Sequence, residues 1–147
     1  MAGFHRVPSA RITAMATRVF GVPIAFISFM DENEQWFKSC IGMDSKPARR
    51  DLSFCGHAIL QDAPLVIEDA RKDERFHDNP GVVGPPHVRF YAGRPLRSRG
   101  GHKVGTLCII DTEPRRMSVD DLDNLNDLAV WTEREIGNFE EEKRSVK

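Results

Sequence analysis

Val88–Asp111 reads VRFYAGRPLRSRGGHKVGTLCIID. Two apolar runs, Phe90–Leu96 and Val104–Ile110, flank a polar segment that carries two adjacent glycines. Glycine tolerates the positive φ angles that a tight antiparallel connection needs, so the pattern predicts a β-hairpin. Both alternating sets of the second run are largely apolar, which is typical of a strand covered on both faces. We therefore expect this hairpin at the centre of a sheet.

The sequence before the hairpin predicts one helix and two strands near its start. Ser9–Phe20 has apolar residues at helical spacing, and Gly21 follows as a helix stop. Ile24–Met30 is apolar on both alternating sets, so we expect a second buried strand. Gln35–Ile41 is expected to return beside it, at a sheet edge because it is short and carries a lysine. Strict alternation places Trp36, Lys38 and Cys40 on one face of this strand, and Phe37, Ser39 and Ile41 on the other.

The middle of the chain predicts short elements and one long loop. Ser53 can cap a short helix over Phe54–Gln61, and Leu65–Ile67 fits a brief strand. Glu68–His87 carries three prolines and two glycines without a clear period. Loops this long inside a compact domain are usually functional or disordered. We expect an ordered cover over the sheet, because the loop has apolar residues to bury: Phe76, Val82 and Val83.

The end of the chain predicts a long helix that begins with a short capping box, Ser118 and Asp121. Its apolar stripe has a spacing of three and four residues: Leu122, Leu125, Ala129, Thr132, Ile136 and Phe139. The near-heptad run favours a partner helix, so we expect a homodimer. The contact or relay residues would be Leu125, Thr132, Ile136 and Phe139. The alternative is that the stripe packs only on its own sheet.

Composition limits the classes of protein that fit. The 147 residues suit one domain, 1–147, with a core over about residues 10–137 and a charged helical extension at 138–147. The net charge of −1 argues against a nucleic-acid-coating protein. No apolar run approaches the roughly 20 residues that span a bilayer, and the amino terminus lacks a secretory core. Three cysteines make no disulfide framework, so we expect a cytoplasmic protein with reduced thiols.

The order of elements predicts an α+β fold. Neighbouring strands are mostly linked by hairpins, so we expect a central antiparallel sheet of about five or six strands. The terminal helices are expected on one face of that sheet. His77, His87 and His102 do not match a recognised metal-ligand spacing, so no metal site is expected.

Several blocks of sequence, in this order, carry a resemblance to a known family: Phe20–Ser28, Gln35–Ser39, Ser53–Ile59, Asp73–Phe76, Asn79-Pro80, Arg89–Leu96 and Gly105–Asp111. They make the chain resemble a GAF domain, a small PAS-related sensory module of bacterial sensor kinases and cyclic-di-nucleotide signalling proteins. The resemblance implies that the short helix and long loop cover the second face of the sheet. It also implies an unidentified small-molecule ligand or cofactor, and a fused kinase or cyclic-di-nucleotide enzyme in a longer parent.

The expected ligand pocket lies between the long loop and the sheet. Cationic and aromatic groups beside a covered sheet suit a small anionic or aromatic ligand. The candidate pocket residues are Cys55, His57, Arg75, Phe76, His87, Arg89, Tyr91 and Cys108. The alternative is that Arg75 and Arg89 pair with nearby aspartates and simply hold the loop in place.

Three functional hypotheses follow. The first is a non-enzymatic sensor or regulatory domain that signals through its terminal helices. The second is a ligand-free dimerisation module, which bulky side chains filling the space under the loop would favour. The third is an enzyme similar to free methionine-R-sulfoxide reductase, a GAF-fold enzyme that works through cysteines. A cysteine near a helix start can be reactive, as Cys55 would be, but Cys40 and Cys108 in strands are typical of apolar fillers.

Overall fold

The computed structural model describes residues 8–30, 34–43, 48–49 and 54–145, and for residues 34, 48–49 and 138–145 it describes the backbone alone. The elements, in chain order, are α1 Ser9–Phe20, β1 Ile24–Met30, β2 Glu34–Ile41, β3 Ala48–Arg49, α2 Phe54–Ala58, β4 Leu65–Ile67, the 3₁₀ turn η2 Ala70–Lys72, α3 Pro80–Val83, β5 Phe90–Arg97, β6 Lys103–Asp111 and α4 Val119–Ser145. The six strands form one sheet in the order β3-β2-β1-β6-β5-β4, and every pair is antiparallel. The predicted α+β fold is confirmed.

The hairpin of β5 and β6 lies inside the sheet, as the sequence predicts. Tyr91 pairs with Ile110 near one end of the hairpin, and Leu96 pairs with Gly105 near the other. Gly101 takes a φ of 84° in the connection, a conformation that favours glycine. On its other edge β6 pairs with β1, so both faces and both edges of β6 are covered.

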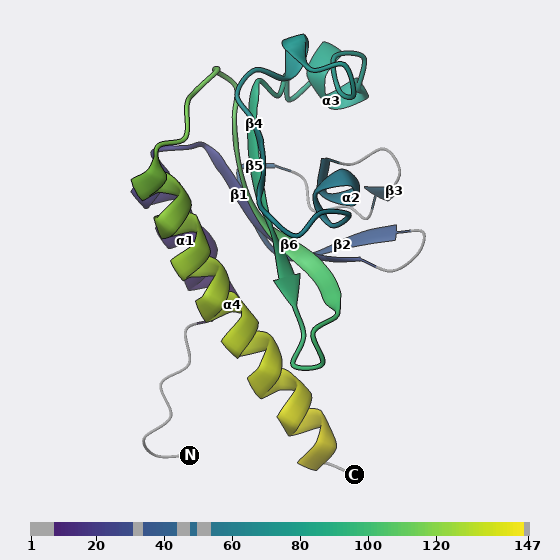
Figure 1. Cartoon of the computed structure of the whole chain (residues 1–147), viewed down its shortest axis with the longest axis vertical. Coiled ribbons are helices and arrows are strands. Elements are labelled where there is room, and N and C mark those ends of the chain that lie inside the picture. The colour runs from purple at the N-terminus through teal and green to yellow at the C-terminus, as the bar shows by residue number, and fades with distance from the viewer. Residues whose placement is uncertain (1–7, 31–33, 44–47, 50–53, 146–147) are drawn as a thin grey trace.

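Two layers cover the sheet, one on each face (Figure 1). The terminal helices α1 and α4 lie on one face, where they bury the helix-side cluster: Ile12, Ala16, Phe20, Val22, Ala25, Ile27, Phe90, Ala92, Leu96, Leu107, Ile109, Leu125, Leu128, Ala129 and Ile136. The short helix and the long loop lie on the other face, where they bury the loop-side cluster: Ile24, Phe26, Phe54, Cys55, Ala58, Leu65, Ile67, Ala70, Phe76, Val82, Val88, Tyr91, Cys108 and Ile110. The predicted layers are confirmed.

The strict alternation predicted for β2 is wrong, and the predicted edge position is wrong at its start, where the two-residue β3 pairs with it. Ile27 of β1 pairs with Ser39, but the next residue, Ser28, pairs with Phe37, so Lys38 is an extra residue in the ladder. Such a bulge moves the following side chains to the opposite face. Phe37 and Cys40 therefore both pack against the loop-side cluster, while the Ser39 hydroxyl hydrogen-bonds the Thr13 hydroxyl on the helix side at 2.8 Å.

The long loop is an ordered cover, but it is more structured than the sequence indicates. It contains η2 and the four-residue α3, whose cap is the Asn79 side chain. Phe76 and Val82 are buried, as predicted, whereas Val83 is 69% exposed because it lies on the outer side of α3. The preceding helix α2 is shorter than predicted and ends at Ala58, and the proposed cap, Ser53, lies outside the described residues.

The helix α4 is held at its start and along its length. Ser118 and Asp121 form the predicted capping box, with each backbone amide donating to the other residue's side chain at 3.0 Å. Further along, Glu133 accepts hydrogen bonds from the Arg94 guanidinium and from the Arg97 backbone amide, both at 2.8 Å. The helix is thereby joined to β5. Within the described residues, no helix has the length and apolar character to cross a membrane.

Candidate functional site

Four of the predicted pocket residues meet in the loop-side cluster, where they pack against one another. Phe54 stacks on Phe76 with ring centroids 4.3 Å apart, and on Tyr91 at 5.1 Å. Cys55 and Cys108, separated by 53 positions in the sequence, bring their sulfur atoms to 3.1 Å. The described side chains under the loop therefore form a packed aromatic and sulfur-containing cluster, which is the filling that the ligand-free alternative predicts at this position.

A line of buried polar atoms crosses this cluster from strand to strand. The Ser28 and Thr106 hydroxyls lie 3.0 Å apart, and the Thr106 hydroxyl lies 3.3 Å from the Cys108 sulfur. The Tyr91 hydroxyl donates to the Cys55 sulfur at 3.0 Å and is 3.6 Å from Cys108. Tyr91 can adopt this position because Gly93 has no Cβ, which would collide with the phenol. The chain satisfies polar groups that would otherwise be costly to bury.

The two thiols differ in acidity. Burial alone would raise the pKa of Cys55, but hydrogen bonds from Cys108 and Tyr91 outweigh it and leave that pKa below its ordinary value. Burial and the neighbouring Cys55 raise the pKa of Cys108 well above its ordinary value. Burial also raises the pKa of Tyr91, so its hydroxyl keeps its proton and remains a donor. Cys55 is therefore the sulfur that ionises first.

Gln35 of β2 adds an unsatisfied donor beside the thiols. Its side chain is 2% exposed, and its amide nitrogen makes no hydrogen bond within the described residues. It lies close enough to Cys55 to help lower the pKa of that thiol. Buried polar groups are normally paired, so the Cys55 sulfur is the acceptor that this donor would take.

The other predicted pocket residues line the outer edge of the cluster. The half-buried His57 ring meets the Phe76 ring edge to face at 4.8 Å. Arg75 lies over the same ring, 5.3 Å from its centroid, and makes a bidentate pair with Asp73 at 3.0 and 3.1 Å. Hydrogen bonding from Arg75 holds the pKa of Asp73 below its ordinary value. Arg75 thus pairs with a nearby aspartate, as the alternative predicts, and stabilises the loop locally, since Asp73 is two residues away.

The remaining two residues, His87 and Arg89, hold the end of the loop. Arg89 donates to the Val82 and Val88 carbonyls at 3.0 and 3.1 Å, rather than to an aspartate. His87 is exposed and has a φ of 61°, which is uncommon for a residue other than glycine. Both positions therefore shape the return of the chain into β5.

A groove at the sheet edge was missed by the sequence analysis. It has a volume of about 770 Å³ and lies between the start of the loop and the turn before α4. Its lining residues are Val66, Ile67, Glu68, Asp69, Arg71, Lys72, Asp73, Pro114, Arg115 and Arg116. No spacing in the sequence pairs these two segments, since they meet only when β4 and β6 have taken their places at either side of β5.

Arg115 connects the groove to both terminal helices. Its backbone amide donates to the Glu68 carbonyl at 3.2 Å, and its guanidinium donates to the Phe20 carbonyl at the end of α1 at 2.6 Å. The guanidinium also lies over the Phe90 ring, 5.8 Å from its centroid. Arg115 also precedes α4, which begins four residues further along at Val119.

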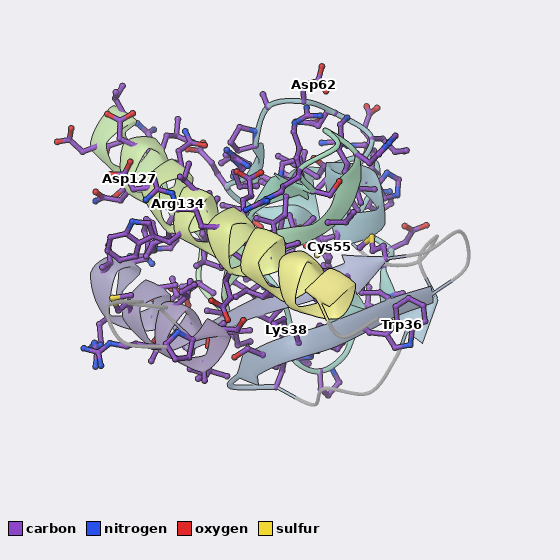
Figure 2. The ribbon with its side chains drawn as sticks, turned by 90° about the horizontal axis from the view of Figure 1, so that it is seen from below. Trp36, Lys38, Cys55, Asp62, Asp127 and Arg134 are labelled. Carbon is purple, nitrogen blue, oxygen red and sulfur yellow. The ribbon has the colours of Figure 1, made fainter. Side chains whose placement is uncertain are left out.

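Three of the four predicted dimer or relay residues are covered by the chain itself. Leu125, Thr132 and Ile136 are buried on the inner side of α4, and Phe139 lies where only the backbone is described. The outward side of α4 carries two partly exposed apolar side chains, Val130 at 38% and Trp131 at 42%. Figure 2 shows the exposed Asp127 and Arg134 on the same helix. Over the ranges that the structure describes, no cluster of three or more histidine, cysteine or acidic residues could hold a metal ion.

Comparison with known proteins agrees with this architecture. The family model for the GAF domain matches residues 9–136. A cyclic di-GMP phosphodiesterase of Pseudomonas aeruginosa is 49% identical over 104 residues, which are 71% of this chain but 18% of that protein. The chain therefore spans less than a fifth of this relative.

Two solved structures show the same fold at low sequence identity. The GAF domain of PixJ from Thermosynechococcus elongatus has a TM-score of 0.73 at 12% identity, over 94% of this chain and 88% of that one. A free methionine-R-sulfoxide reductase from Neisseria meningitidis has a TM-score of 0.72 at 18% identity, over 87% and 75%. With the family model covering most of the sequence and the sheet, helices and loop in the matching arrangement, this chain belongs to the GAF family.

Proposed function

We propose that this chain is a cytoplasmic, non-enzymatic regulatory domain that passes a small-molecule signal through α4 to a fused output enzyme of cyclic-di-nucleotide signalling. The output class is suggested by the relative named as a cyclic di-GMP phosphodiesterase. The observation that carries the proposal is Arg115, which contacts the groove, the end of α1 and the approach to α4. It gives a physical route from a bound molecule to the terminal helices.

The groove favours a small anionic ligand. Four of its lining residues are cationic, Arg71, Lys72, Arg115 and Arg116, against three acidic residues. Asp69 pairs with Arg71, and Asp73 pairs with Arg75 outside the lining, so three cations remain against one acid, Glu68. The remaining positive charge would attract carboxylate or phosphate groups.

Binding of anionic probes tests this assignment of the groove. Native mass spectrometry of the purified chain would reveal a retained molecule, and calorimetric titration with citrate and AMP would measure affinity for anions. Replacing both Lys72 and Arg116 by alanine is expected to weaken binding about tenfold or more, since two charge-assisted contacts are lost. Arg18→Ala, an exposed site on α1, is the control. Absence of any retained mass and of any probe binding would refute a ligand at the groove.

A chimera tests the regulatory role. The matching segment of the Pseudomonas aeruginosa relative would be replaced by this chain, and cyclic di-GMP hydrolysis compared with the intact and segment-deleted forms. Arg115→Ala in the chimera is expected to change the rate about fivefold or more, a typical coupling between sites, while Arg18→Ala leaves it unchanged. Equal rates in the intact, deleted, chimeric and Arg115→Ala forms would sink the proposal.

A second function, self-association, is favoured by the outward side of α4. Asp127, Val130, Trp131 and Arg134 fall on one face at helical spacing, and all four are exposed. The midpoint between residues 127 and 134 falls between the two apolar residues. This makes the patch self-complementary, as a two-fold interface requires.

The charges select the direction of the paired helices. In an antiparallel pair, each Asp127 meets the partner's Arg134 around a core formed by the two copies of Val130 and Trp131. In a parallel pair, Asp127 would instead meet the partner's Asp127, which is a repulsive contact. We infer an antiparallel crossing, which buries a small area and therefore forms a weak dimer.

Charge reversal tests this dimer. Sedimentation velocity is expected to show that Asp127→Arg and Arg134→Asp each weaken self-association about tenfold, since each creates like-charge contacts. The variant with both changes restores the opposite-charge pairs and should recover the affinity of the unchanged chain. A parallel dimer would be insensitive to the single reversals, and that result would contradict the antiparallel crossing.

A further inference from the structure

Two thiols far apart in the sequence are held in direct contact by the fold. Cys55 in α2 and Cys108 in β6 are 1% and 0% exposed, and their sulfur atoms lie 3.1 Å apart. A disulfide bond is about 2.05 Å long, so these atoms need to approach by about 1 Å to be joined. Both cysteines are free thiols. The fold thus holds a dithiol close to the geometry of its oxidised form.

A few polar groups lie beside the pair within an otherwise apolar cluster. The Tyr91 hydroxyl donates to Cys55 at 3.0 Å, and the orphaned Gln35 amide lies beside the same sulfur. These donors stabilise a thiolate, which is the nucleophilic form of cysteine. Cys108 retains its proton, because burial and the adjacent Cys55 raise its pKa. This arrangement favours Cys55 as the sulfur that attacks first and Cys108 as the sulfur that reacts second.

We propose that Cys55 and Cys108 form a reactive thiol pair that reduces a small hydroperoxide and closes into a disulfide. This inference goes beyond the proposed regulatory function and does not depend on it. It assigns Cys55 as the attacking sulfur and Cys108 as the resolving one. Tyr91 and Gln35 are positioning residues that act through Cys55.

The chemistry balances with a hydroperoxide as the only oxidant. The Cys55 thiolate attacks the outer oxygen of the O–O bond, which breaks, and an alcohol (or water, from hydrogen peroxide) leaves with the proton that Cys55 gave up. Cys55 is then a sulfenic acid. The Cys108 sulfur attacks the Cys55 sulfur, the S–O bond breaks, and the hydroxide leaves as water with the Cys108 proton. Two thiols are oxidised and one peroxide is reduced.

The oxidant reaches the pair only when its cover opens locally, because both sulfurs are buried. The helix α2 has five residues, and an element this short opens more readily than a long one. Phe54, adjacent to Cys55, is stacked on Phe76 of the long loop. Drawing Cys55 toward β6 therefore displaces a ring that supports the loop.

A metal ion between the two sulfurs fits this geometry less well. Two thiolates on one tetrahedral zinc, each at about 2.3 Å, lie roughly 3.8 Å apart, which is further than the sulfurs here. The described residues also supply no group of three or more ligands. A covalent sulfur–sulfur bond is the closer match.

Peptide mapping of the full chain tests the pair. The reduced protein would be treated with hydrogen peroxide, its remaining thiols blocked, and its peptides identified by mass spectrometry. We expect a cross-linked peptide that joins Cys55 to Cys108 and is cleaved by dithiothreitol. Oxidation of Cys40 with Cys55 and Cys108 still reduced, or a disulfide that includes Cys40, would overturn the proposal.

Single substitutions separate the two roles. Cys108→Ser is expected to leave a sulfenic acid on Cys55 that dimedone traps, whereas Cys55→Ser should give no dimedone adduct at Cys108. Cys40→Ser is the matched control, because Cys40 is a half-buried thiol that donates to the Met43 carbonyl at 3.4 Å, and it should still form the cross-link. If Cys108→Ser or Cys55→Ser fails to fold, the peptide mapping of the unchanged chain decides whether the two cysteines form the disulfide.

The pH profile of oxidation shows whether Tyr91 acts on Cys55 as a hydrogen-bond donor or only packs against it. Cys108 and Tyr91 from the sheet, with the neutral Gln35 and Thr106, are the groups among the described residues that set the acidity of Cys55. Tyr91→Phe removes one donor, so the pH of half-maximal oxidation rate should rise by about one unit, a tenfold change in thiolate fraction. A purely structural role would lower thermal stability and leave this midpoint unchanged, and that result would remove Tyr91 from the proposal.

Discussion

The two faces of the sheet are built from the same strands but from different chemistry. In β6, Leu107 and Ile109 point into the helix-side cluster, while Cys108 and Ile110 point into the loop-side cluster. The helix side is mainly aliphatic and is covered by two full-length helices. The loop side holds stacked rings, two thiols and a line of polar atoms under short elements. The comparison teaches that this fold separates a mainly aliphatic face from one that buries thiols, rings and polar groups.

The difference follows from how each cover satisfies its own backbone. A helix pairs its amides and carbonyls internally, so its cover needs only apolar side chains to attach it. The loop must use side chains for the same purpose, as when Asp69 accepts from the Arg71 amide or Asn79 from the Gly81 amide. Contacts of this kind can be released a few at a time, so we expect the loop side to open locally more readily than the helix side.

The largest effect on the free energy of unfolding is expected from a substitution on the helix side. Leu107→Ala removes a fully buried side chain from the central strand, so the free energy of unfolding should fall by about 3 kcal/mol. Urea unfolding followed by circular dichroism measures this change. A loss below about 1 kcal/mol would mean that the helix-side cluster does not carry the stability we assign to it.

A substitution on the loop side should lower the stability of the whole domain and also loosen the loop locally. Phe76→Leu removes a stacked ring from the loop-side cluster, and we expect a loss of about 1.5 kcal/mol in the free energy of unfolding. Hydrogen exchange should quicken more at the Val88 amide, which is bonded to the Gly81 carbonyl at 2.8 Å, than at amides of β6. Val83→Ala, at an exposed site on the same loop, is the control. Uniform quickening across the sheet would erase the proposed distinction between the faces.

Weakening the attachment of α4 to β5 should have a smaller effect on the free energy of unfolding. Glu133→Gln weakens two hydrogen bonds, to the Arg94 guanidinium and the Arg97 amide, and is expected to lower the free energy of unfolding by about 1 kcal/mol. Glu135→Gln, on the same helix, serves as the comparison. Equal stability of the two variants would show that α4 is held by apolar packing alone.

The smallest effect on the free energy of unfolding is expected from the ion pair between Asp73 and Arg75. Asp73→Asn should cost about 0.5 kcal/mol at pH 7, because Arg75 is half exposed and the pair is screened by water. The folded-state pKa of Asp73 is lowered by hydrogen bonding from Arg75, so its contribution is complete above the ordinary aspartate pKa. The difference from the Asn variant should vanish as pH falls through the folded-state pKa. A difference that is unchanged in acid would contradict an ionic contribution.

Much of the fold could be predicted because local patterns are strong where the elements are regular. The helix Ser9–Phe20 and the strand Ile24–Met30 occur with the bounds that apolar spacing and glycine indicate. The bulge at Lys38 could not be predicted, since it depends on pairing with β1 and leaves no mark in residue type.

The residues of the candidate site were easier to predict than the contacts between them. Cys55, Phe76, Tyr91 and Cys108 were each expected near the loop, but the contact between the two sulfurs needs the three-dimensional path of α2 over β6. The groove was missed for the same reason, because Lys72 and Arg116 are 44 positions apart in the sequence and carry no shared motif. Side chains that are brought together only by tertiary structure give no local signal.

The pairing of β1 with β6 also affects how the chain can be made. Ile24 pairs with Ile110, so the middle of the sheet cannot close until Ile110, 86 positions further along the sequence, has left the ribosome. Until then the β1–β2 hairpin has one open edge and exposes Phe26 and Ile27 to the cell. Contacts that span so much of the sequence also slow folding. A molecular chaperone that shields β1 until β6 emerges should therefore raise the yield of folded protein.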